Sequence, residues 1–273
     1  MARPDLHIRG DAAVLAAGSH LAFGDVDPVT WELIGEARVD GHLPVAPFGA
    51  VPALDAWKDH GRVVHDAAAS LGEDLDLSSL PKGQAVVFSL HATKVLGSGE
   101  GGFAVFGDPK DAEQFRSWTN FGFAGSRVSQ RQSINAKMSE IQCAYVHAAL
   151  DGWEVEREEW EAARNVIVPM LDALGIDLFE SSRAGINPYV IARFGSEAFA
   201  SHVEQTLAER FVETRRWWSR CCHTMPAYRQ HGHGRYPAAE HAAATSLGLP
   251  FFRGLSERHA ERIHGALEAA LDA

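Results

Sequence analysis

The chain has 273 residues, of which 46% are hydrophobic and 22% are charged, a composition typical of a globular protein with one large domain or a large and a small one. Its formal net charge of −11 at pH 7 and the absence of a basic run argue against nucleic acid as a partner. The three cysteines have neither metal-ligand nor disulfide spacing, and we recognise no signal peptide or membrane-spanning run, so we expect a cytoplasmic protein.

From residue 6 onward, short apolar runs alternate with helical patterns, which predicts a mostly parallel α/β fold. The run at 86–90 predicts a buried strand, followed by a polar, glycine-dense loop and a second strand at 103–106. The other predicted elements of this half are strands at 6–8, 20–26, 42–45 and 62–65, helices at 11–17, 52–60, 108–118 and 139–150, and a long polar loop at 122–137. A capping box, Ser139 to Gln142, opens the last of these helices.

The composition changes at Trp153, where a long charged and then apolar helical pattern begins. We therefore predict a large domain at 1–152 and a smaller α+β domain at 153–273. The elements expected in the second domain are helices at 154–174, 197–210 and 257–271, strands at 188–194 and 211–217, and a histidine-rich irregular loop at 221–236.

Two reactive side chains follow apolar runs, Asp66 after 62–65 and Lys94 after 86–90. Ligands of open α/β sheets bind at the carboxyl ends of strands. Each residue alone has an ordinary explanation, Asp66 as a helix N-cap and Lys94 as a buried ion pair. Together they are the pair that pyridoxal phosphate requires, an amine for a Schiff base and a carboxylate for the pyridine nitrogen. Ser89 is placed either to donate to the phosphate or to cap a strand-end carbonyl.

Two other patterns suggest different chemistry and are weaker. Gly97, Gly99 and Gly102 match the G-x-G-x-x-G dinucleotide fingerprint, but a polar segment precedes them and a strand-like run follows, where a helix is needed. The histidines near the C-terminus lack partners at metal-ligand spacing, so we assign no metal site. For the vicinal pair Cys221-Cys222 we expect a structural role.

Several longer motifs, taken together, resemble one family. They are V-V-H-D-A-A-A-S-L-G at 63–72, F-S-L-H-A-T-K-V-L-G-S-G-E-G-G at 88–102, N-F-G-F at 120–123, N-A-K-M-S-E-I-Q-C-A at 135–144, E-T-R-R-W-W at 213–218 and L-G-L-P-F-F at 247–252. In this order they are similar to the DegT-type sugar-nucleotide aminotransferases, which are fold-type I enzymes that use pyridoxal 5′-phosphate.

The resemblance implies roles for five residues. Lys94 corresponds to the Schiff-base lysine, Asp66 to the partner of the pyridinium nitrogen and Ser89 to a phosphate ligand. Ala69 stands where many members place Gln or His against the cofactor ring. Asn135 corresponds to an asparagine that reaches the cofactor phosphate of the neighbouring subunit, which implies a homodimer with shared active sites. The family's upstream phosphate-binding turn has no counterpart after Met1, so we expect weaker cofactor affinity.

The resemblance implies an aminotransferase that converts a nucleotide-linked keto-sugar to an amino sugar, with glutamate as donor, in polysaccharide or secondary-metabolite biosynthesis. Arg127, Arg131 and Lys137 are candidates for binding the anionic substrate, or else belong to a solvated or dimer surface. One alternative is a non-catalytic homologue with a structural or regulatory role. Another is a pyridoxal-phosphate sugar dehydratase, which Lys94 disfavours because such relatives carry histidine at that position.

Overall fold

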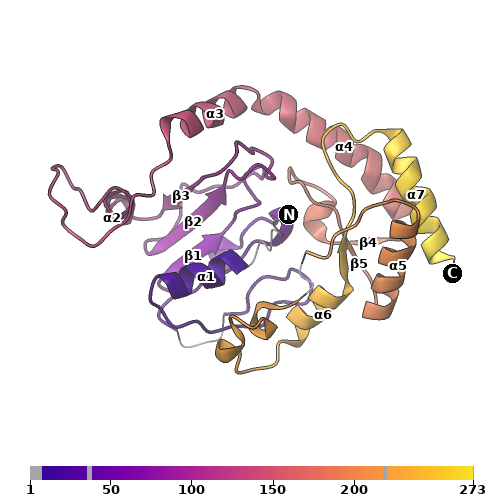
Figure 1. Cartoon of the computed structure of the whole chain (residues 1–273), viewed down its shortest axis with the longest axis horizontal. Coiled ribbons are helices and arrows are strands. Elements are labelled where there is room, and N and C mark those ends of the chain that lie inside the picture. The colour runs from indigo at the N-terminus through magenta and orange to yellow at the C-terminus, as the bar shows by residue number, and fades with distance from the viewer. Residues whose placement is uncertain (1–7, 36–38, 218–219, 273) are drawn as a thin grey trace. The chain divides into compact units, whose positions relative to one another are not determined.

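The computed structural model describes residues 8–35, 39–217 and 220–272, and the chain separates into two compact units (Figure 1). The central unit comprises residues 39–155. The terminal unit comprises the described residues up to 35 together with those from Glu156 onward.

The sheet of the central unit has the strand order β1-β2-β3. Strand β1 (Val63–Asp66) runs parallel to β2 (Gln84–Ser89), and β3 (Gly102–Phe106) runs antiparallel to β2. Residues 42–45 continue the sheet beyond β1 through single parallel bridges from His42 to Val63 and from Val45 to Asp66. The strands predicted around 62–65, 86–90 and 103–106 are thereby confirmed. They could be predicted because the apolar pattern of each lies within a few consecutive residues.

One face of this sheet packs on a small core. Val86 and Phe88 of β2 are buried there with Ala67 and Leu80, against leucines from the connection between β1 and β2. Val87 lies between them in the sequence and is exposed, as the alternation of side chains along a strand requires. The core thus fixes which face β2 turns inward and where its last residue, Ser89, lies.

Helices α2 (Pro109–Thr119) and α3 (Glu140–Asp151) follow the sheet, as predicted. The Asp108 carboxylate accepts a hydrogen bond from the Lys110 amide, and the Ser139 hydroxyl accepts one from the Gln142 amide, so each helix begins at a side-chain cap. The α2–α3 segment (residues 120–139) is irregular apart from isolated bridges. No residue of α3, a helix described in full, is buried.

The terminal unit combines helices with a small antiparallel sheet of order β4-β5-β6. Side chains from α4, α5 and α7 form its core with the sheet. Its elements are α1 (Ile8–Ala16), α4 (Trp153–Ala173, which starts at the unit boundary), β4 (Asp177–Leu178), β5 (Ile191–Arg193), α5 (Glu197–Glu209), α6 (Pro237–Thr245), β6 (Ser246–Gly248) and α7 (Glu257–Leu271). The helices predicted at 11–17, 154–174, 197–210 and 257–271 correspond to α1, α4, α5 and α7.

The N-terminal residues, which we expected in the large domain, group with the terminal unit instead. The Asp25 carboxylate accepts hydrogen bonds from the backbone amides of Ala238 (3.2 Å) and Ala239 (3.0 Å) at the start of α6. Trp31 stacks on Phe179 with ring centroids 4.3 Å apart. These contacts join residues far apart in sequence, and no local pattern announces them.

Three predicted elements differ from the structure. Of the described residues 20–26, Val26 alone forms a bridge, to Leu33, and the helix predicted at 52–60 is only a short 3-10 turn, Leu54–Trp57. Of the strand predicted at 211–217, Arg215 alone forms a bridge, to Gly248 of β6, and Phe211 at the start of the run has a left-handed backbone (φ 58°) that a strand does not allow. The strand predicted at 6–8 lies mostly outside the described residues, and α1 begins at Ile8.

Candidate active site

Two neighbouring parallel strands end together at one edge of the central sheet. Asp66 is the last residue of β1 and Ser89 the last residue of β2. Asp66 lies opposite Val87, so Ser89 extends two residues beyond it on the adjoining strand. Residues 42–45 end at the same edge, beside Asp66. This edge therefore collects three carboxyl ends, which is where ligands of open α/β sheets bind.

Lys94 lies in the loop that follows β2 and is only 6% exposed. We call residues 90–101 the lysine loop. Three backbone hydrogen bonds close it, from Leu90 to the Gly101 carbonyl (2.9 Å), from Ala92 to the Gly99 carbonyl (2.7 Å) and from Lys94 to the His91 carbonyl (2.8 Å). Val95 and Leu96 are buried beside it in the sequence and anchor the loop. The amine is thus kept away from bulk water at the end of a strand.

The Asp66 carboxylate is half-buried and accepts a hydrogen bond from the Ala68 amide (3.1 Å). The residues after it form a turn, so the alternative prediction of a helix N-cap is replaced by a local turn cap. Ala69 lies in this turn and is buried, and the Ser70 hydroxyl donates to the Ala50 carbonyl (2.7 Å). The turn after β1 is thereby tied to the chain that follows residues 42–45.

The Ser89 hydroxyl oxygen accepts a hydrogen bond from the His91 amide (3.2 Å). A serine hydroxyl that accepts one bond still has its own hydrogen to donate. His91 is held in turn by Thr93 (2.9 Å) and by Glu100 (3.6 Å), both within the lysine loop. The Ser89 hydroxyl can therefore still donate a hydrogen bond at the sheet edge, which suits an anion.

Asn135 lies apart from these residues in the contacts that the structure describes. It is exposed on the α2–α3 segment, where its backbone bridges to Asn120. Its side-chain oxygen accepts a hydrogen bond from Lys137 Nζ (2.7 Å), and that ammonium group lies 4.5 Å from the Phe121 ring centroid. Because the oxygen of the amide is engaged, its NH₂ group is the part left to donate elsewhere. The structure thus brings Asp66, Ala69, Ser89 and Lys94 to one region and leaves Asn135 on the surface.

Sequence reasoning missed two features of the central unit. Phe48 is buried in the 3-10 turn Pro47–Gly49 and has a left-handed backbone (φ 52°), a conformation uncommon for aromatic residues. In β1, His65 points to the opposite face from Asp66 and lies 2.9 Å from Gln84 Oε1, while Gln84 Nε2 donates to the Trp57 carbonyl (2.8 Å). Burial lowers the pKa of His65, and the Gln84 hydrogen bond only partly opposes this shift.

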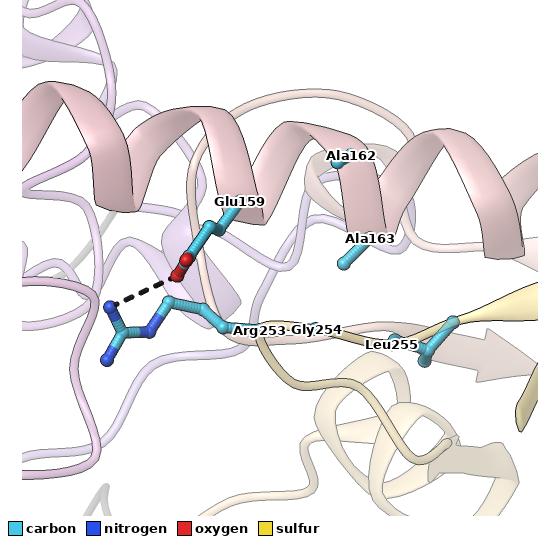
Figure 2. A pocket seen from close by; sticks show the side chains of 6 residues that line it. All are labelled: Glu159, Ala162, Ala163, Arg253, Gly254 and Leu255. Carbon is cyan, nitrogen blue, oxygen red and sulfur yellow. Dashed lines mark ion pairs between the residues drawn. The ribbon is translucent and has the colours of Figure 1, made fainter.

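The terminal unit contains a separate hollow of about 420 Å³ (Figure 2). Glu159, Ala162 and Ala163 of α4 line one side, and residues 253–255 line the other. Arg253 forms ion pairs with Glu159 (3.5 Å) and Glu156 (3.1 Å). The charge of this arginine is therefore already balanced, and none of the predicted site residues lines the hollow.

The vicinal cysteines lie in the terminal unit near acidic groups. Burial, followed by Glu240 and Asp25, raises the pKa of Cys221 to about 11, and burial with Asp11 raises the pKa of Cys222 still further. Thiols of this kind stay protonated at neutral pH, which favours a structural role. Within the described parts of the chain there is no group of three or more His, Cys, Asp or Glu side chains arranged to hold a metal ion. No described helix has the length and hydrophobicity to span a bilayer.

Comparison with known proteins decides the family. The model of the DegT/DnrJ/EryC1/StrS aminotransferase family matches residues 10–268. The chain belongs to this family. The match covers both units and includes every residue that the sequence analysis selected as a candidate, so the resemblance drawn from the motifs is confirmed.

Two curated relatives are similar to most of this chain. The chain is 29% identical over 256 residues to the erythromycin biosynthesis sensory transduction protein EryC1 of Saccharopolyspora erythraea, covering 89% of this chain and 69% of that protein. It is 27% identical over 255 residues to dTDP-3-amino-3,4,6-trideoxy-alpha-D-glucose transaminase of Streptomyces venezuelae, covering 89% of this chain and 66% of that enzyme. The chain thus spans about two thirds of the length of these relatives.

Solved structures agree on the fold. DesI, crystallised in the presence of its TDP-sugar product, is 30% identical, with a TM-score of 0.75 over 95% of this chain and 72% of DesI. NtdA of Bacillus subtilis, with bound cofactor PMP, has a TM-score of 0.84 over 96% of this chain and 65% of NtdA, at 19% identity. The predicted class, an α/β fold of the type I pyridoxal-phosphate-dependent transferases, is therefore confirmed.

Proposed function

We propose that this chain carries the lysine site of a cytoplasmic, pyridoxal-phosphate-dependent aminotransferase that acts on a nucleotide-linked keto-sugar. The observation that carries the proposal is the buried Lys94 amine one loop beyond β2, with Asp66 and Ser89 at the same sheet edge. Family membership and the transaminase among the curated relatives support it. The free thiols of Cys143, Cys221 and Cys222 fit a reducing compartment.

The residues present fit the cofactor by their chemistry. Lys94 would hold it covalently through Nζ, the Asp66 carboxylate would face the pyridine nitrogen, and the Ser89 hydroxyl would donate to the phosphate. Buried Ala69 adds little bulk beside the ring. When bound, pyridoxal phosphate supplies an electron sink that allows a carbon next to nitrogen to lose a proton.

Lys94 then has a second task as a general acid and base. When not bonded to the cofactor, Nζ would accept the α-proton of the amino donor and deliver a proton to the sugar carbon that gains the amino group. Because hydrogen bonds within its own backbone close the lysine loop, the backbone that carries the Lys94 side chain is held in place. The Asp66 carboxylate is oriented for its role by the Ala68 amide.

For the substrate we propose a dTDP-linked keto-sugar of secondary metabolism and for the donor glutamate. The dTDP-sugar transaminase and DesI support the nucleotide. Arg127, Arg131 and Lys137 are exposed cations on the α2–α3 segment, and we propose that they contribute to binding the diphosphate.

We further propose that two copies form a homodimer with shared sites. Exposed apolar side chains gather on α3, among them Ile141 (73% exposed) and Tyr145 (63% exposed), and a second copy would cover them. Asn135, with its amide oxygen occupied by Lys137, would donate its NH₂ group to the cofactor phosphate of the partner.

The test is covalent trapping. The purified protein is mixed with pyridoxal phosphate, its visible spectrum is recorded, and borohydride reduction is followed by peptide mapping. We expect a visible band and an adduct on Lys94 that disappear in Lys94→Ala and persist in Lys82→Ala, which removes an exposed lysine of the same unit. Absence of both signals at high cofactor concentration would refute catalysis by this chain alone and favour the non-catalytic alternative.

A further inference from the structure

The lysine loop is held from outside by the first turn of α3. Gln142 Nε2 donates a hydrogen bond to the Ser98 carbonyl oxygen and lies 3.3 Å from the Ser98 hydroxyl. The two residues are 44 positions apart in sequence, so the contact joins separate parts of the central unit. The Ser139 cap fixes where α3 begins and thus where Gln142 projects.

Glycines make this approach possible. Gly99 has φ +111°, and a Cβ there would lie 3.2 Å from Gln142 Oε1. Gly101 has φ +135°, and a Cβ there would lie 2.7 Å from the Met138 methyl carbon. The backbone of the loop therefore lies directly against Met138 and Gln142, at distances that side chains on the loop would prevent.

Short backbone hydrogen bonds couple Ser98 to the arm of the loop that carries Lys94. The Ser98 amide donates to the Leu90 carbonyl (3.0 Å), and the Gly99 carbonyl accepts from Ala92 (2.7 Å). A Cβ at Gly97 would lie 2.5 Å from the Ala92 carbonyl oxygen, so the two arms of the loop are in direct contact. A displacement of Ser98 must therefore be transmitted to the arm that carries Lys94.

We propose that Gln142 is a positioning residue for Lys94, acting through the Ser98 carbonyl to hold the lysine loop closed. This deepens the proposed function and rests on it for the role of Lys94. Without the donor, the loop samples open arrangements in which Nζ is misplaced. Small misplacements of a reacting group are costly, so we expect formation of the lysine adduct to slow about tenfold or more.

The experiment compares Gln142→Glu and Gln142→Ala with Gln114→Ala, a control at an exposed position on α2. Gln142→Glu keeps the size of the side chain but replaces the donor by an acceptor facing a carbonyl. The first readout is amide hydrogen exchange of residues 90–101 in cofactor-free protein. The second is the rate at which borohydride traps pyridoxal phosphate on Lys94, and, with substrate, the separate changes in kcat and KM.

We expect both Gln142 variants to exchange faster in residues 90–101 with unchanged exchange in β1, to form the Lys94 adduct more slowly, and to lose kcat with little change in KM. The control should match the unaltered protein. The proposal would be overturned if residues 90–101 of both variants exchanged amide hydrogens at the rate of the unaltered protein. It would also be overturned if Gln142→Glu matched the unaltered protein in both loop exchange and the rate of Lys94 adduct formation. If the unaltered protein forms no adduct, the proposed function fails, and the exchange data still decide whether Gln142 holds the loop.

Discussion

Replacing Gln84 by methionine tests the buried polar pair that His65 and Gln84 form in the central sheet. His65 and Gln84 are each 1% exposed, so bulk water cannot replace a lost hydrogen bond. The amide oxygen of Gln84 can only accept, so His65 Nε2 is the donor, and Gln84 Nε2 donates to the Trp57 carbonyl. Gln84→Met leaves the buried His65 Nε2 donor unpaired, whereas the Trp57 carbonyl still accepts from the His60 amide (3.0 Å). At about 2 kcal/mol for the unpaired donor, the free energy of unfolding of the central unit should fall by about 2 kcal/mol.

A double-mutant cycle makes this expectation specific. His65→Phe leaves one buried acceptor unpaired, the Gln84 amide oxygen, and should cost about 2 kcal/mol. In the double variant both partners of the buried hydrogen bond are gone and the Trp57 carbonyl still accepts from the His60 amide, so the cost should stay well below the sum of about 4 kcal/mol that simple addition gives. The measurement is urea dependence of hydrogen exchange in β1 and β2, which reports the central unit alone. Additive costs would refute the reasoning.

Three further predictions follow from the same structure. Burial lowers the pKa of His65 below its unfolded value. The stability that neutral His65 contributes is therefore complete above pH 6.5 and is lost as the pH falls below that value. Urea melts between pH 7 and pH 5 should show a fall in the free energy of unfolding, and His65→Phe should make that fall smaller. Gly102→Ala should destabilise by about 2 kcal/mol or more in urea melts, because its Cβ would lie 2.5 Å from the Phe88 carbonyl oxygen, whereas Gly195→Ala, with open space around it, should be neutral. Cys221, with a pKa raised to about 11, should react with iodoacetamide at pH 8 at roughly a thousandth of its limiting rate, and mass spectrometry of native and urea-unfolded protein should show the difference.

Local patterns were enough to predict the elements that carry the candidate site. Asp66, Ser89 and Lys94 each end or follow an apolar run, and the structure has β1 and β2 there. Helix α6 was missed although a signal existed, since Pro237 at the first position and a run of alanines both favour a helix. Strands β4 and β6 are too short to show a period, and both form by pairing with β5.

Other features depend on contacts that no local pattern contains. His65 and Gln84 are polar residues in apolar runs, and neither indicates in sequence that it is the partner of the other. The left-handed backbone of Phe48 is imposed by its surroundings, because aromatic residues do not favour it. Asn135 was selected through resemblance alone, and the structure gives it an exposed position on the α2–α3 segment.

The glycines of the lysine loop show how a correct pattern can have a different cause. Gly97, Gly99 and Gly102 match a fingerprint in which glycine allows a ligand to approach the backbone. In the structure a Cβ at Gly97 would meet the Ala92 carbonyl, and one at Gly99 would meet Gln142. The same residue type is required because protein atoms occupy the space beside the backbone. A glycine pattern therefore indicates that a side chain does not fit at those positions. The fold is needed to show whether a ligand or other protein atoms occupy the space.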